Sequence, residues 1–125
     1  MKINSGNKVF DHQTTSIFPG EHKGGTQLSV RIEGGNGRAR KHAIEELRRA
    51  FGFPPPKILK YLDDNVERPV YVHQFFHTRG GQKLVHGWVI TDAETNELRC
   101  KWASERDLSR KILKECITYI TPISE

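Results

Sequence analysis

Three histidines on one predicted hairpin are the residues of this chain best suited to catalysis. His73 and His77 lie two alternations apart on one expected strand, and His86 lies on the next strand. Because side chains alternate along a strand, the three imidazoles are expected to face the same way. Two such histidines can serve as general base and general acid, so the pattern is compatible with a metal-independent ribonuclease of the small toxin type. Nearby cations that could stabilise the charge of its transition state are Arg79, Lys83, Arg99 and Lys101.

The same predicted face is rich in rings and cations. Gly80-Gly81 reads as a two-residue turn, which places Arg79 opposite Gln82 and sets the register of the hairpin. The face then carries Tyr71, His73, Phe75, His77, Leu84, His86, Trp88, Ile90, Arg99 and Lys101. Bases stack on aromatic side chains while Lys and Arg follow phosphates. The pattern predicts a surface for RNA or single-stranded DNA, formed by Tyr71, Phe75, Trp88, Arg79, Lys83, Arg99 and Lys101, with Arg38 and Arg40 as further phosphate contacts.

The opposite face of the predicted sheet is apolar. The register places Val72 opposite Val89 and Phe76 opposite Val85. A second turn at 92–96 ends in an asparagine, which tolerates the left-handed conformation. That turn brings Leu98, Cys100 and Trp102 to the side of Val85 and Val89. An alternative for the ring-bearing face is that a helix covers it too, which would make Tyr71, Phe75, Trp88 and Ile90 ordinary core residues.

The sequence gives little reason to expect a metal or a cofactor. The three histidines have no fourth ligand on their face, because the nearest thiol, Cys100, is predicted on the other side. His12 and His22, both in predicted loop, could contribute, but nothing places them near the sheet. The glycine-rich run 34–37 could hold one phosphate at a helix start, but it lacks the ending of a nucleotide-binding P-loop. The segment Val85-His86-Gly87-Trp88-Val89-Ile90, continued through Asp92, Thr95 and Leu98, resembles a hairpin of the β-class carbonic anhydrases. That family's Cys-x-Asp-x-Arg and His-x-x-Cys motifs are absent, so the resemblance implies no zinc site.

The elements that must position these residues indicate an α+β fold. Alternation predicts a strand over 26–32, and helical spacing predicts helices over 38–51, ending at Gly52, and 57–63. A three-stranded antiparallel meander is expected over about 68–103. A last helix is expected after Ser104, which with Asp107 resembles a capping box. We therefore predict an antiparallel sheet of three to four strands with helices packed on one face.

Length and composition indicate the number of domains, the charge of the partners and the location of the protein. The 125 residues suit one domain, with 1–25 loosely ordered or contributing a short edge strand. Lys and Arg number 20 against 15 Asp and Glu, a formal charge of +5 that favours polyanionic partners. No apolar run is long enough for a membrane span or a conventional leader, so we expect a cytoplasmic protein without a membrane partner. Cys100 and Cys116 both point inward by periodicity, which predicts buried free thiols.

The sequence is thus compatible with three classes of function. The first is a small basic nucleic-acid-binding protein that uses the ring-bearing face. The second is a ribonuclease with histidine acid–base chemistry on that face. The third is a protein-interaction module, such as an inhibitor, chaperone or phage-type antagonist, whose aromatic face binds a partner protein or a second copy of the chain.

Overall fold

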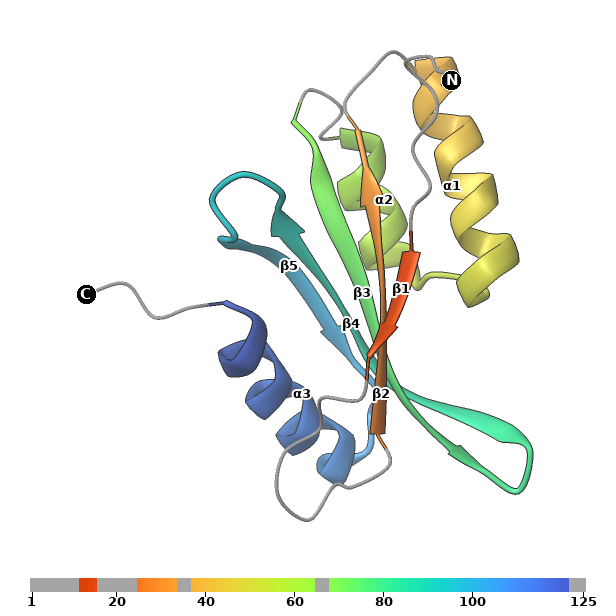
Figure 1. Cartoon of the computed structure of the whole chain (residues 1–125), viewed down its shortest axis with the longest axis vertical. Coiled ribbons are helices and arrows are strands. Elements are labelled where there is room, and N and C mark those ends of the chain that lie inside the picture. The colour runs from red at the N-terminus through yellow and green to blue at the C-terminus, as the bar shows by residue number, and fades with distance from the viewer. Residues whose placement is uncertain (1–11, 16–24, 34–36, 65–67, 122–125) are drawn as a thin grey trace.

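The computed structural model describes residues 12–15, 25–33, 37–64 and 68–121 (Figure 1). Within these residues the chain forms one five-stranded antiparallel sheet and three helices. The strands lie side by side in sequence order: β1 (His12–Thr15), β2 (Gly25–Ile32), β3 (Val70–Arg79), β4 (Gln82–Asp92) and β5 (Leu98–Ala103). The helices are α1 (Gly37–Phe51), α2 (Pro56–Asp64) and α3 (Asp107–Ile120).

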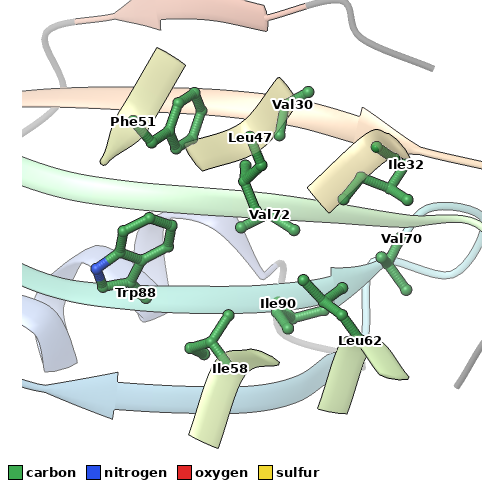
Figure 2. Packing of buried hydrophobic residues seen from close by; sticks show 11 residues of the cluster. Val30, Ile32, Leu47, Phe51, Ile58, Leu62, Val70, Val72, Trp88 and Ile90 are labelled. Carbon is green, nitrogen blue, oxygen red and sulfur yellow. The ribbon is translucent and has the colours of Figure 1, made fainter. Parts of the chain in front are cut away.

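Two apolar clusters lie on the two sides of the sheet. The larger one packs α1 and α2 against one side, which we call the α1/α2 face, with Leu47, Ile58 and Leu62 meeting Val72 and Trp88 of the sheet (Figure 2). The smaller one joins Ile112, Leu113 and Cys116 of α3 to Phe75 and Val89. Because Phe75 is an odd number of residues from Val72 on the same strand, the second cluster lies on the opposite side, the α3 face.

The α+β class and the antiparallel meander over 68–103 are confirmed. The sheet has more strands than expected because β2 pairs with β3 and β1 pairs with β2. Residues 1–25 were expected to be loosely ordered or to contribute a short edge strand. The edge strand is β1, and β2 begins at Gly25. The other residues of this segment lie outside the described part of the chain. All helices were expected on one face of the sheet. Only α1 and α2 share a face, because α3 packs on the other one. None of the described helices is both long and apolar enough to cross a bilayer.

One predicted helix end agrees with the structure, and one predicted helix start does not. Gly52 ends α1 with a φ of 102°, and its amide donates to the Arg48 carbonyl, as expected of a glycine stop. The capping box at Ser104 is not formed. α3 starts two residues further on than a Ser104 cap would place it, with Arg106 as its cap residue and no side-chain cap bond, while the Ser104 hydroxyl accepts from the Arg106 amide.

A β-bulge in β4 changes which residues share a face. The register is as predicted from the turn to Phe76, which pairs with Val85, but Phe75 pairs with Gly87, so His86 is an extra residue. Val72 consequently faces Ile90 instead of Val89. A Cβ at Gly87 would lie 2.7 Å from a Leu113 methyl group and 2.8 Å from the Trp102 carbonyl oxygen, so any other residue would force α3 or β5 to shift.

The predicted division of the meander into two faces is therefore wrong beyond the bulge. Trp88 and Ile90 join the α1/α2 face, whereas Val89 belongs to the α3 face. The side chains of Cys100 and Trp102 pack against the α1/α2 cluster, opposite Ile90 and Trp88. A second register shift falls at Arg99, since Ile90 pairs with Cys100 and Thr91 with Leu98. Leu98 is consequently exposed and outside both apolar clusters.

Candidate nucleic-acid interface

Two of the three rings that were expected to stack on bases, Phe75 and Trp88, are core residues. Trp88 is 2% exposed and packs against Phe51 of α1, with ring centroids 5.9 Å apart (Figure 2). Phe75 is fully buried under α3. The prediction that Phe75 and Trp88 form an open stacking surface is therefore wrong, because helices cover both sides of the sheet. For these two residues the alternative of an ordinary core is correct, as it is for Ile90.

The other residues predicted on that face are dispersed. Tyr71 is half-buried, with the Arg31 guanidinium 5.7 Å from its ring centroid. Arg99 donates to Asp92 at 2.9 Å and lies 3.2 Å from Glu97, so its charge is largely compensated within the protein. Lys101 is exposed on β5 opposite Val89. The structure thus brings no group of rings and free cations together on the α3 face among the described residues.

Asp92 is the centre of the ionic group that holds Arg99. Its carboxylate is buried, accepts from Arg68 at 2.8 Å and from Arg99, and also accepts from the amides of Glu94 and Thr95. The Arg68 hydrogen bond, followed by these others, holds the pKa of the Asp92 carboxyl well below its usual range. These hydrogen bonds therefore fix the β4–β5 turn. Arg99 has a structural role because it donates one of them.

His73 occupies a buried polar site between β2, β3 and β4. Its Nδ1 is 2.9 Å from the Ser29 hydroxyl and its Nε2 is 2.9 Å from the Thr91 hydroxyl. The side chain is 7% exposed, and burial lowers the pKa of the imidazole to about 4. His73 is consequently neutral near pH 7 and is closed to a substrate.

His77 and His86 come together at the bulge. The Nδ1 atom of His77 lies 2.7 Å from Nε2 of His86, whose Nδ1 lies 2.6 Å from the Ser109 hydroxyl in the first turn of α3. Ser109 is fully buried and His86 nearly so. This chain of hydrogen bonds ties α3 to the root of the β3–β4 hairpin. Because His73 and His86 are both buried, the three predicted histidines form no pair that a substrate could reach. The ribonuclease hypothesis stays a prediction.

Four cations lie on the outer side of α1, where Glu45 is also exposed and Arg49 pairs with Glu46 at 3.4 Å. Arg38, Lys41, Arg48 and Arg49 are all exposed and recur at spacings of three, seven and eleven residues, so they lie on one side of the helix. We call these four residues the α1 stripe. The opposite side of α1 packs into the core through Ala43, Leu47 and Phe51. Arg40, the other cation predicted to contact phosphate, is 2% exposed on α1, so it is not part of the stripe.

An exposed aromatic residue stands at the end of the α1 stripe. Phe53 is 74% exposed, and the Arg48 guanidinium lies over its ring, 4.1 Å from the centroid. Sequence analysis missed Phe53 because it belongs to no strand or helix. The available signal was its position between the helix-ending Gly52 and the rigid Pro54-Pro55-Pro56 run, outside both predicted helices.

The β3–β4 hairpin joins this surface through Lys83. The Lys83 ammonium donates to the Phe51 carbonyl oxygen at 3.0 Å and to Gln74 Oε1 at 2.9 Å. Burial lowers the pKa of this ammonium, which the Phe76 ring also contacts at 4.9 Å. Lys83 therefore holds the C-terminal end of α1 to the hairpin, and it is a positioning residue instead of a free phosphate contact.

The tip of the hairpin is cationic and open. Gly80 and Gly81 have φ values of 58° and 78°, the left-handed pair that a tight hairpin turn requires. Arg79 precedes them and is exposed. The sequence from Val70 to Thr91 contains no acidic residue, and Figure 1 shows the hairpin extending beyond the helices. The tip thus presents an exposed cation on the hairpin that Lys83 bonds to the end of α1.

Comparison of the chain with known protein families, with curated proteins and with solved structures found no match. Within the described residues, no three His, Cys, Asp or Glu side chains are grouped so that they could hold a metal ion. Residues 34–36, most of the glycine-rich run considered for a phosphate, lie outside the described part of the chain, as does His22. The two cysteines are free thiols, with Cys116 buried and Cys100 half-buried.

Proposed function

We propose that this protein binds nucleic acid through the α1 stripe, Phe53 and the tip of the β3–β4 hairpin. The observation that carries the proposal is the pairing of Arg48 with an exposed Phe53 ring at the end of a cationic helix side. A ring held in this way leaves its other side open for a base, while the neighbouring arginines follow the phosphates. Nucleic-acid binding is the class of function predicted from the sequence, but the surface proposed for it is no longer the ring-bearing face of the sheet.

Single-stranded RNA or DNA is the favoured ligand. A base can stack on Phe53 only when it is unstacked from its neighbours, as in loops and single strands. The net charge of +5 adds a general attraction for polyanions. The hairpin contributes Arg79 at its tip, and the Lys83 bonds to the end of α1 keep the two basic elements at a fixed relative position.

The charge part of the proposal is tested by the salt dependence of binding. For single strands, log K falls with log salt concentration with a slope of roughly −0.7 for each phosphate contact. Replacing Arg38 and Lys41 by glutamine removes two cations of the α1 stripe, both exposed and remote from the core. We expect the slope to become shallower by roughly 1.4, measured with a labelled oligo(U) by fluorescence anisotropy.

The matched control is Lys114→Gln, which removes an exposed cation from α3 on the other side of the sheet. This variant should leave the slope unchanged. Binding that does not depend on salt, or equal slopes for the stripe variant and the wild type, would contradict the proposal.

A further inference from the structure

The helix α3 presents two apolar residues that the rest of the described structure leaves exposed. Its core side carries Ser109, Ile112, Leu113 and Cys116, all buried. Beside that row, Leu108 is 57% exposed and Tyr119 is 63% exposed. They are eleven residues apart, which is close to three helical turns, so both side chains lie along one line on the helix surface.

Two opposite charges lie between these apolar residues. Lys111 and Glu115 are both exposed and belong to the same stripe at spacings of three or four residues from Leu108 and Tyr119. The pair Leu108/Tyr119 and the pair Lys111/Glu115 are both centred close to position 113. An identical helix placed antiparallel on this stripe therefore sets each Leu108 beside a Tyr119 and each Lys111 beside a Glu115 of the other copy.

We propose that the chain forms a homodimer with two-fold symmetry in which α3 packs antiparallel against α3 of a second copy. A two-fold interface uses the same patch on both subunits, so the patch must be complementary to itself. The stripe Leu108, Lys111, Glu115 and Tyr119 meets that condition in both charge and apolar character. Because one helix from each subunit supplies the contact, the dimer is a weak and reversible one, below the area of a standard interface.

Charge exchange tests this arrangement directly. In Lys111→Glu each interhelical pair becomes two carboxylates, and in Glu115→Lys it becomes two ammonium groups. Each variant alone should associate at least tenfold more weakly than the wild type in sedimentation velocity over a range of protein concentrations. An equimolar mixture of the two variants restores opposite charges at both positions and should recover association, and so should the double exchange Lys111→Glu/Glu115→Lys.

Controls separate the interface from general effects of charge. Lys57→Glu reverses an exposed cation on α2, which packs on the other side of the sheet, and should associate like the wild type. Circular dichroism should show the same helix content for every variant. A wild-type chain that stays monomeric at several hundred micromolar would overturn the proposal. So would single exchanges that associate as the wild type does, or a mixture that fails to recover association.

Discussion

The Arg48 guanidinium lies over the ring of Phe53, 4.1 Å from its centroid, at the point where α1 ends. Gly52 reverses the chain there through its positive φ, and the proline run that follows carries the chain away toward α2. Phe53 is therefore presented to solvent by backbone geometry, and Arg48 holds its ring in place. This relationship is the basis of the proposed binding surface, and it requires nothing from the core of the sheet.

Truncation of Trp88 should affect stability and not a binding contact. Its ring fills the space between Phe51 and the α1/α2 face, so Trp88→Ala leaves a large cavity. We expect the free energy of unfolding to fall by about 3–5 kcal/mol in urea denaturation. Phe53→Ala, which removes an exposed ring, should change it by less than about 0.5 kcal/mol. A Trp88→Ala protein as stable as the wild type would contradict the assignment of Trp88 to the core.

The bulge at His86 depends on the glycine that follows it. An alanine at position 87 would place its Cβ against the Leu113 side chain and the Trp102 carbonyl oxygen. The carbonyl belongs to the backbone of β5 and cannot move without disturbing the sheet. Gly87→Ala should therefore lower the free energy of unfolding by about 1–3 kcal/mol. Glu105→Ala, at an exposed position before α3, is the matched control and should be nearly neutral.

These features show where sequence reasoning was sufficient and where it was not. Turn residues and periodicity located β2 to β5, the helices and the register next to Gly80-Gly81, because each depends on local backbone preferences, whereas His12 of β1 was expected in loop. The faces of β4 could not be predicted by counting alternation, since one extra residue reverses every side chain beyond it. Gly87, an isolated glycine in a strand, was the local sign of that bulge.

The candidate site was less predictable than the fold. Rings and histidines on strands were expected to be exposed because the tertiary position of α3 is not encoded in any local pattern. Once α3 covers the second face, Phe75 and His86 become interior residues. By contrast, the α1 stripe follows from helical spacing alone, although only the structure shows how Lys83 connects the hairpin to it.

The buried His73 predicts a particular dependence of stability on pH. Its pKa of about 4 in the folded protein lies below the ordinary value of 6.5, so between these values the unfolded chain binds the additional proton. The free energy of unfolding should therefore fall as the pH is lowered from about 6.5 to about 4, by up to roughly 3 kcal/mol.

His73→Gln keeps a polar group at the site and should flatten the curve in that window, as measured by urea denaturation at a series of pH values. The Asp92 carboxyl, whose pKa is lowered from 3.8, loses its contribution only at pH values below that number, so the two effects are separable. An equally steep curve for His73→Gln between pH 4 and 6.5 would show that other groups cause the dependence.

The most direct test of the account is the affinity of Phe53 variants for a single strand. Wild type, Phe53→Ala and Phe53→Trp are compared by fluorescence anisotropy with a labelled oligo(U) at one salt concentration. Loss of one stacked base costs about 1–3 kcal/mol, so Phe53→Ala should bind about 5- to 150-fold more weakly, while Phe53→Trp keeps or improves the wild-type affinity. Equal affinity of Phe53→Ala and the wild type, with both proteins folded, would contradict the proposed binding surface.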